Sequence, residues 1–381
     1  MALSLSRNAT VILSYQAASA AESTYDGAGN NPADANTFEI GVLDGFSFTQ
    51  ATSTQNVMLN EAGTSPKRGQ SIFNTSIEPV DWSFTTYIRP RIDDLTTDFH
   101  GMTEKILWNA LAASVKTNNT GTGGVTSTAT ECTVDFEESN KNQLLKLTGW
   151  FKFSDSAINY RLSNMCVNSA SMDFDVDGIA QITWSGYASA VDSVAVGNTP
   201  TTAGAATDGY VAAPSTADFI LNRLSTVVLT SSISGSSKAY TFALTGGNVT
   251  FDNGISYVTP ETLGVINEPI DHQTGTRAIS GNFTAYLDTA ALSTKIMYDD
   301  MLADVNSAAP DITNVFSIVL SIGGASAPKV VFNMPKAHLE LPTLDTADVM
   351  GVTINFTALE DGFGTGNDEA TIAYTGLTVV A

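Results

Sequence analysis

The amino-acid sequence predicts a mainly β protein built as a tandem duplication, with one helix in each copy of a β-sandwich or half-barrel domain. Three observations favour this fold class. Thr, Ser, Asn and Gly fill many polar positions, and these residues suit strands and turns. Several stretches alternate apolar and polar residues with a period of two. Short segments of the first half recur, in the same order, in the second half.

The amino-acid composition limits which structures and functions are possible. The 381 residues include 17 Lys and Arg against 39 Asp and Glu, which gives a formal net charge of −22. This charge argues against tight wrapping of nucleic acid, because such wrapping needs Lys and Arg to neutralise phosphates. The hydrophobic fraction of 43% is enough for a buried core. The two cysteines make no disulfide framework and fit assembly in a reducing compartment. No apolar run reaches the roughly 18 residues of a membrane-spanning helix.

The internal repeat starts at the N-terminus. Residues 3–14 (LSLSRNATVILS) match residues 219–230 (FILNRLSTVVLT), with Arg, Thr, Val and Leu aligned at an offset of 216. A cleaved export signal would not recur in the middle of a protein. The first segment is therefore expected to be a strand and not a leader.

Five further segments recur in the same order. They pair Thr37–Phe38 with Thr241–Phe242, Val80–Ile88 with Ile279–Leu287, Lys105–Trp108 with Lys295–Tyr298, Asn164–Met165 with Asn333–Met334, and Ile182–Trp184 with Val352–Ile354. The spacing between the copies shrinks along the chain, so copy one carries insertions, which surface loops tolerate. We expect domain copy one at 1–192, a linker rich in Thr, Ala, Gly and Pro at 193–216, domain copy two at 217–361 and a C-terminal tail at 362–381.

Periodicity predicts the elements of each copy. Alternation over 82–87, 145–152, 316–320 and 352–356 predicts strands with one packed face. Apolar residues spaced by three and four predict one helix near 102–113 and another near 294–304. The order is the same in both copies: strands, a long loop, a strand, a helix and further strands.

Each copy has a long segment between its early strands, at 50–78 and 252–277. Loops longer than about 15 residues are usually functional or disordered. The apolar residues here would be poor choices for a free loop, so the segments are candidates for an arm that docks on a neighbouring subunit; a loop folded onto its own domain is the alternative. The candidate residues are Met58, Leu59, Lys67, Arg68, Ile72, Val258, Leu263 and Ile266.

No catalytic or metal-binding constellation is found in the sequence. The three histidines are far apart, and no nucleotide-binding, zinc-binding or nucleophile motif is present. Residues 173–178 (DFDVDG) copy the start of a calcium loop, but Trp184 stands at the twelfth position, where a bidentate Glu is needed. Alternation favours a strand with these aspartates on a solvated face. We therefore predict no enzyme, no cofactor and no metal.

The order of elements, the long segments and the tandem copies resemble bacteriophage tail tube proteins, in particular those with two tube domains in one chain. The segment Gly366–Thr375 (GNDEATIAYT) is similar to the Asp-Glu strand on which such proteins often close. The resemblance covers nearly the whole chain, and its features are architectural and not catalytic.

This resemblance implies a structural virion protein of the phage tail, assembled in the host cytoplasm and without a membrane partner. Copies of the chain would form trimeric rings with pseudo-sixfold symmetry, stacked into a tube through which genomic DNA passes without specific binding. Further implied partners are the baseplate or tip, terminator and tape measure proteins, and a sheath if the tail is contractile. By position, the strands of the barrel would contain Val80, Trp82, Phe84, Tyr87, Ile279, Phe283 and Tyr286.

The net charge agrees with this implication, because an acidic lumen repels phosphates and leaves no site that traps DNA. Acidity that only keeps the protein in solution is the alternative. Another virion or surface β-protein, such as a decoration protein, an adhesin or a carbohydrate-binding module, is the second functional hypothesis. Binding modules usually expose aromatic platforms, whereas all four tryptophans here lie in predicted regular elements.

Overall fold

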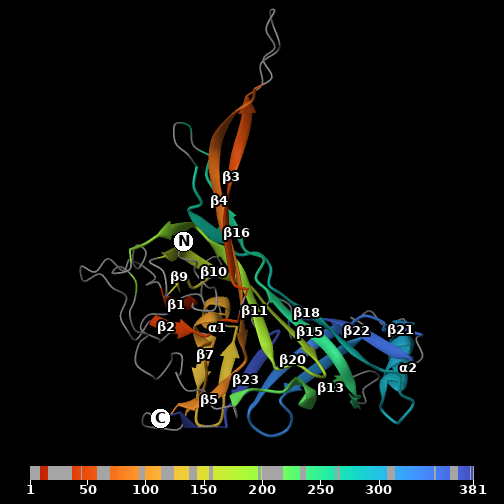
Figure 1. The fold of residues 1–381 in the computed structure, drawn as a ribbon. Helices are drawn as coiled ribbons and strands as arrows, with labels where there is room; N and C mark the ends of the chain where they lie inside the picture. The colour runs from red at the N-terminus through yellow and green to blue at the C-terminus, as the bar shows by residue number, and fades with distance from the viewer. Residues whose placement is uncertain are drawn as a thin grey trace, which may run out of the picture.

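The computed structural model describes residues 9–15, 37–43, 45–57, 69–93, 99–112, 124–136, 144–153, 158–195, 199, 218–231, 237–261, 263, 267–306, 314–346, 349–360, 368–377 and 379–380. The expected linker at 193–216 lies almost entirely outside these residues. The fold is mainly β, as predicted, with α1 in the first half of the chain and α2 in the second (Figure 1).

The elements of the first half are β1 (Ala9–Tyr15), β2 (Thr37–Ile40), β3 (Ser47–Val57), β4 (Ser71–Tyr87), β5 (Pro90–Asp93), β6 (Phe99–Met102), α1 (Lys105–Ala112), β7 (Gly124–Ser127), β8 (Cys132–Asp135), β9 (Leu147–Phe153), β10 (Ile158–Asp175), β11 (Gln181–Ala188) and β12 (Ala190–Ser193). Those of the second half are η5 (Asn222–Leu224), β13 (Thr226–Ser231), β14 (Lys238–Thr241), β15 (Leu244–Asp252), β16 (Ser256–Val258), β17 (Asp271–Gln273), β18 (Ala278–Tyr286), α2 (Thr294–Val305), β19 (Val315–Ile322), β20 (Lys329–Leu339), β21 (Thr343–Asp345), β22 (Gly351–Ala358), β23 (Thr371–Thr375) and β24 (Val379–Val380).

A long strand in each half passes from one sheet into another. The first part of β10 pairs with β9, and its second part pairs with β11, where Ala170 faces Trp184. In the second half β20 pairs with β19 and then, at Leu339, with Phe356 of β22. The pairing with β22 continues through the short strand β21. Each half therefore consists of two sheets that share one strand.

Strand registers show how the two halves correspond. Phe84 pairs with Trp184 between β4 and β11, and Phe283 pairs with Ile354 between β18 and β22. These are the equivalences that the sequence matches at Val80–Ile88 and Ile182–Trp184 predict. The outer sheets correspond in the same way, because β1 lies between β2 and β9 as β13 lies between β14 and β19.

One of the shorter sequence matches was wrong by two residues. Leu13 pairs with Phe38, and Leu229, its counterpart, pairs with Tyr240, so Tyr240 and not Phe242 corresponds to Phe38. A shift of two residues keeps the same strand face, which is why the dipeptide match was satisfied in the wrong place.

A second short match was wrong by three residues. Leu162 pairs with Gly149 as Met334 pairs with Ile318, so Leu162 and not Met165 corresponds to Met334. The register of β10 on β9 shifts between Leu162 and Met165. β20 on β19 has the same shift, between Met334 and Ala337, so both copies carry this bulge. A match of only two residues was therefore satisfied by chance in the wrong place.

The second part of β10 also joins the two halves. It pairs antiparallel with β15 from Ser169 opposite Asp252 to Asp175 opposite Gly246. The result is one continuous sheet in the order β3, β4, β11, β10, β15, β18, β22, β21 (Figure 1). We call it the continuous sheet.

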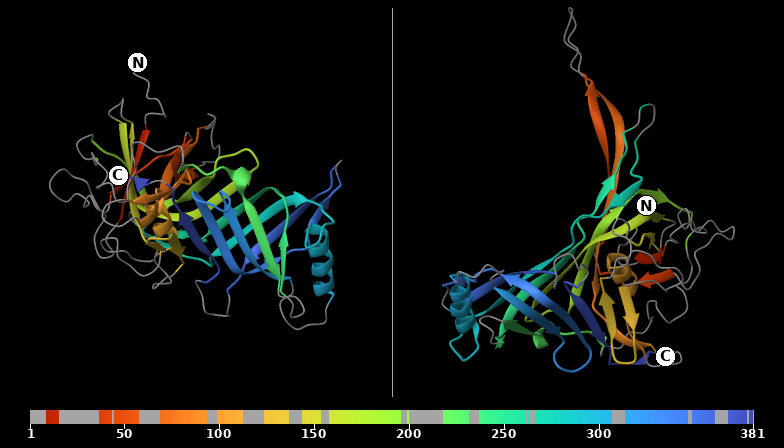
Figure 2. Two further views of the ribbon diagram at one scale, coloured as in Figure 1. Left: turned by 90° about the horizontal axis from the view of Figure 1, so that it is seen from below. Right: turned by 180° about the vertical axis from the view of Figure 1, so that it is seen from behind.

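One hydrophobic core runs beneath the continuous sheet in both halves. Helix α1 is packed into it, with every residue from Ile106 to Ala112 buried. The Trp108 ring meets Trp184 edge-on at 5.0 Å and Phe251 of the second half at 5.6 Å between centroids. Helix α2 lies at the far end of the molecule and buries only Thr294, Met297 and Met301 (Figure 2).

The segment 362–381, expected as a tail, contributes the strands β23 and β24 to the fold, and β24 pairs parallel with β5. β23 pairs with β20 on one side and with β8 of the first half on the other. Its alternate residues Ile372 and Tyr374 are fully buried, and the Trp108 indole N–H donates to the Tyr374 hydroxyl at 2.8 Å. The end of the chain therefore returns to the first half and packs beside α1.

Candidate functional site: a polar sheet face and two arms

The continuous sheet has one apolar face and one polar face. The apolar face covers the core. Short polar side chains, exposed or half-buried, occupy the alternate positions and form the polar face: Ser47, Thr49, Asp81, Ser83, Thr85, Ser171, Asp173, Thr183, Ser185, Asn248, Thr250, Ser280, Asn282, Thr284, Thr353, Asn355 and Thr357. Period-two alternation in the strand segments that contain these residues produces this separation.

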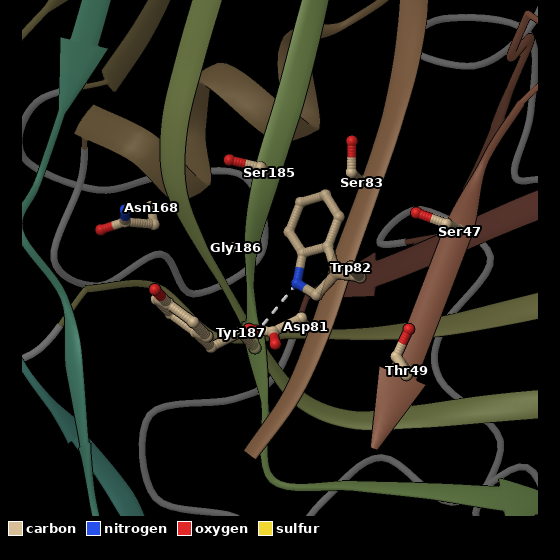
Figure 3. A pocket seen from close by; sticks show the side chains of 9 residues that line it. All are labelled: Ser47, Thr49, Asp81, Trp82, Ser83, Asn168, Ser185, Gly186 and Tyr187. Atoms are coloured by element: carbon tan, nitrogen blue, oxygen red, sulfur yellow. Dashed lines mark hydrogen bonds between the residues drawn. The ribbon is translucent and has the colours of Figure 1, made fainter. Parts of the chain in front are cut away.

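Hydrogen bonds connect the polar face from strand to strand. The hydroxyls of Thr85 and Thr183 lie 3.0 Å apart across β4 and β11. At the junction between the halves, the Asn248 amide donates to the Asp173 carboxylate at 2.6 Å. A hollow of about 230 Å³ near the β3 end exposes Ser47, Thr49, Asp81, Ser83 and Ser185 beside the Trp82 ring (Figure 3).

The charge on this sheet has one sign. Of the 17 Lys and Arg residues, none lies in β3, β4, β11, β15, β18, β21, β22 or the part of β10 from Cys166 to Asp175. The same strand segments contain Glu78 and five aspartates, Asp81, Asp173, Asp175, Asp252 and Asp345. A polyanion that approaches the described polar face therefore meets hydroxyls, amides and carboxylates and no cation.

The strand residues singled out from the sequence divide between the two faces. Val80, Trp82, Phe84, Ile279 and Phe283 are at most 2% exposed and face the core. Tyr87 and Tyr286 occupy the opposite parity, and Tyr286 is 53% exposed. The core-facing residues position the sheet, while the polar face is formed by Ser, Thr, Asn and Asp residues that belong to no binding or catalytic motif in the sequence.

The long segment of the first half is an arm, and the expectation of a loop across 50–78 was wrong for most of it. β3 and β4 pair as far as Val57 opposite Ser71, and the hairpin projects from the body of the molecule (Figure 1). Ser, Thr and Gln follow one another there without apolar alternation, since both faces of the arm meet solvent, so no strand period shows in the sequence. Ile72 and Phe73 are 58% and 63% exposed.

The second arm is the β16–β17 hairpin, which runs beside the first (Figure 1). Its Asn267 carbonyl accepts a hydrogen bond from the Ile77 backbone N–H at 2.9 Å. Val258 is 48% exposed and Leu263 is fully exposed. The remaining candidates of the two arms, Met58, Leu59, Lys67, Arg68 and Ile266, lie outside the described residues.

His272 anchors the second arm to the first half. The Leu144 backbone N–H donates to its Nε2 at 3.0 Å, and its Nδ1 lies 3.2 Å from the Cys166 sulfur. Next to it, Lys146 forms an ion pair with Asp271 at 2.6 Å. Burial lowers the pKa of His272, so the imidazole is neutral and can accept from Leu144. His272 and Cys166 are 106 positions apart, and no local motif indicates that they meet.

The thiol of this cluster is shielded from solvent. Cys166 is fully buried, and burial raises the pKa of its thiol to about 12. A thiol with such a pKa is not a nucleophile at neutral pH. Asp173 and Asp175, from the calcium-like motif, lie on the exposed face of β10, as their alternation predicts. Among the described residues, no group of three or more His, Cys, Asp or Glu side chains is placed to hold a metal ion.

Both edges of the continuous sheet lack a partner strand within the described part of the chain. β3 pairs with β4 alone, and β21 pairs with β22 alone. Apolar side chains are exposed at the β21 edge, where Leu341 and Leu344 are 39% and 41% exposed. Unpaired strand edges are templates for pairing with another chain.

Helix α2 lies at this same end of the sheet (Figure 1). Its Leu302 and Val305 are 41% and 44% exposed. Neither helix of the described chain has the length and apolar character needed to cross a membrane.

The chain is similar in sequence to known proteins. The sequence profile described as phage tail tube protein matches residues 24–358. Tail tube protein pb6 of Escherichia phage T5 is 29% identical over 337 residues, which are 87% of this chain and 70% of that protein.

Proposed function

The chain belongs to the phage tail tube protein family and is a structural protein of the tail, and we propose that three copies close into a ring of six domains. Rings of this kind stack into the tube through which genomic DNA leaves the virion. The domains are copy one at 1–192 and copy two at 217–361, joined by the linker at 193–216, with the segment 362–381 returning to copy one.

The observation that carries this proposal is the junction between β10 and β15. It joins two corresponding half-sheets edge to edge within one chain, from Ser169 opposite Asp252 to Asp175 opposite Gly246. The same operation, repeated between chains, would extend the continuous sheet at both of its unpaired edges. Because such a contact is head-to-tail, it forms a ring when the rotation closes. Closure also removes the exposed edges.

The polar face would line the lumen. The opposite face is covered by the outer sheets and by α1, so the polar face is the one left free to surround a channel. Its hydroxyls, amides and carboxylates supply no cation for phosphates to pair with, and DNA would slide past without being held. Tyr87 and Tyr286, from the predicted barrel strands, would lie on this lumen side.

The arms would make the axial contacts between rings. Ile72 and Phe73 are exposed on a hairpin that projects from the body, and Val258 and Leu263 are exposed on the neighbouring hairpin. Covering these side chains on an adjacent ring would bury apolar surface worth about 25 cal/mol per Å². The tail tip or baseplate, terminator and tape measure proteins, and a sheath in a contractile tail, would meet the ends, lumen and outside of the tube. Assembly in the host cytoplasm accords with two buried cysteines that form no disulfide.

The alternative of a carbohydrate-binding module or adhesin receives no support from the tryptophans. All four, Trp82, Trp108, Trp150 and Trp184, are at most 2% exposed and form core contacts. They therefore present no aromatic platform to a ligand.

Negative-stain electron microscopy of the purified protein tests the proposal. Rings or hollow tubes of uniform diameter are expected, with six similar masses around each ring. A protein that stays monomeric at high concentration across a range of salt concentrations would overturn it.

A further inference from the structure

We propose a specific register for the contact between chains: β21 of one copy pairs antiparallel with β3 of the next, with Thr343 opposite Thr49, Leu344 opposite Phe48 and Asp345 opposite Ser47. Helix α2 packs over this contact as α1 packs over the junction inside the chain. The inference rests on the proposed ring and deepens it by naming the partner surface, which is a second copy of this chain.

The junction inside the chain is the template. There, Ser171 pairs with Thr250, Met172 with Val249 and Asp173 with Asn248. The Ser171 and Thr250 hydroxyls lie 3.1 Å apart on the polar face. Met172 and Val249 are buried on the core face. The template therefore has two polar pairs that flank one apolar pair.

The counterpart of β10 in the second half is β20 continued by β21. Ser171 pairs with Thr183 of β11, and Thr343 pairs with Thr353 of β22. Thr183 and Thr353 correspond, because each lies one residue before the matched pair Trp184 and Ile354. Thr343 therefore takes the place of Ser171, Leu344 that of Met172, and Asp345 that of Asp173.

The register irregularity supports this correspondence. In the first half, the pairing of β10 with β11 shifts by one residue between Val167 and Ser169. In the second half, the pairing with β22 shifts by one residue between Leu339 opposite Phe356 and Thr343 opposite Thr353. The same bulge at the same place means that both strands present the same residues to their outer edge.

The counterpart of β15 in the first half is β3. Val249 pairs with Gly281 of β18, and Phe48 pairs with Trp82 of β4. Gly281 and Trp82 correspond, because each lies two residues before the matched Phe283 and Phe84. Phe48 therefore takes the place of Val249, Thr49 that of Thr250 and Ser47 that of Asn248.

Side-chain chemistry at the two free edges matches the template. Thr343 and Thr49 bring two hydroxyls together, as Ser171 and Thr250 do. Ser47 can donate to the Asp345 carboxylate where Asn248 donates to Asp173. Leu344 is 41% exposed in the single chain and would meet Phe48 on the core face.

Helix α2 has the same relation to the free β21 edge as α1 has to the junction between β10 and β15. Inside the chain, α1 covers the junction, since the Trp108 ring meets Phe251 of β15 and the Leu111 carbonyl accepts from the Asn253 side chain at 2.9 Å. α2, matched to α1 at Lys295–Tyr298, leaves Leu302 and Val305 exposed beside the β21 edge. A neighbouring β3 would supply the surface that covers them.

Cysteine cross-linking tests the register. The double variant Thr49→Cys with Thr343→Cys, assembled and treated with a short thiol cross-linker, is expected to give covalent trimers. The off-register control is Thr49→Cys with Asp345→Cys, which places the second thiol two residues further along the same face. At least tenfold more covalent trimer is expected from the first pair than from the control or from either single variant. The native Cys132 and Cys166 are buried and add no background.

These experiments test the proposed strand register independently of the proposed ring. Rings in the microscope without preferential cross-linking of Thr49 to Thr343 would overturn the register and leave the proposed function standing. Absence of rings from the unmodified protein would overturn both. For α2, Leu302→Asp is expected to lower ring yield at least tenfold and leave the Tm of the isolated chain unchanged. Ile158→Asp, at a similarly exposed site of 42%, is the control, and equal ring yields would overturn the role of α2.

Discussion

Trp82 on β4 covers Gly186, its partner across the strand pair on β11. A Cβ atom on Gly186 would come within 2.8 Å of the Trp82 ring and 2.0 Å of the Cys166 carbonyl oxygen. The Trp82 indole N–H donates to the Tyr187 carbonyl at 3.2 Å (Figure 3). In the second half the corresponding pair is Gly281 and Phe356, so the aromatic residue and the glycine have changed strands.

The first prediction concerns this pair. Gly186→Ala is expected to destabilise the fold by about 1–3 kcal/mol, because the new methyl group collides with backbone that cannot give way. The midpoint of urea unfolding measures the effect. Gly69→Ala is the control, since a Cβ there meets no atom within 4 Å, and its midpoint should stay unchanged. Equal midpoints for the two variants would show that the sheet relaxes freely at Gly186.

The second prediction concerns the strand that returns from the C-terminal segment. Tyr374→Phe removes the hydroxyl that accepts from Trp108 and leaves a buried indole N–H without an acceptor. A loss of about 1–3 kcal/mol is expected. Thermal unfolding compares it with Tyr286→Phe, at a side chain that is 53% exposed and whose loss should be near zero. No difference between the two would mean that β23 contributes little to holding the halves together.

The third prediction is a loss of stability in weak acid. Burial lowers the pKa of His272 in the folded chain, whereas an unfolded histidine titrates near about pH 6.5. As the pH falls, the unfolded state therefore takes up the proton first. The stabilisation that comes from the neutral His272 is fully present above about pH 6.5 and is lost as the pH drops below that value. Urea midpoints of the wild type and His272→Gln at pH 7.5 and 5.5 measure this, and the variant should show the smaller change.

Two other titratable groups, His100 and Asp271, affect the comparison of the wild type with His272→Gln. Burial also lowers the pKa of His100, so part of the pH dependence remains in the variant. Burial favours a higher pKa for Asp271, but Lys146 and the His272 backbone N–H outweigh it and the pKa is lowered. Its contribution is present above the ordinary carboxyl range and is lost only at more acidic pH. An undiminished change in His272→Gln would exclude His272 as the origin.

The fourth prediction separates rings from tubes. Ile72→Ser with Phe73→Ser removes the exposed apolar side chains of the first arm. Rings are expected to form, while tubes become at least several-fold shorter in electron micrographs. The Tm of the isolated chain should not change, because surface substitutions of this kind shift stability by roughly 0.5 kcal/mol or less. Asn74→Ser, on the same strand, is the control, and tubes of wild-type length in the double variant would remove the arm from the axial contact.

The fifth prediction concerns the polar face. Asp81→Lys places three cations in each ring of the proposed lumen. Tubes of this variant should retain duplex DNA at low salt and release it steeply as salt rises, because bound cations displace the counterions of DNA. Glu261→Lys, on the exposed second arm, makes the same charge change away from the polar face. DNA retained equally by both variants, or by neither, would place Asp81 outside the lumen.

Much of the fold could be predicted from local sequence, because half-buried strands carry a period of two. Val80–Ile88 and Ile182–Trp184 were matched to their counterparts in the correct register for this reason. The arm strands were missed, since a hairpin with solvent on both faces has no apolar period. The short matches at Thr37 and Asn164 were misplaced, since a match of two residues is too short to fix a register.

The amino-acid sequence by itself determined the mainly β fold class, the tandem copies, the single helix in each copy and the net negative charge. These properties can be read from periodicity, repetition and composition, because none of them depends on which segments meet in space. Only the tertiary structure decided that β10 joins β15, that β23 returns to β8 and that His272 meets Cys166. Those contacts depend on which strand edges remain free once each half has folded, and free edges are a property of the whole arrangement and not of any one segment.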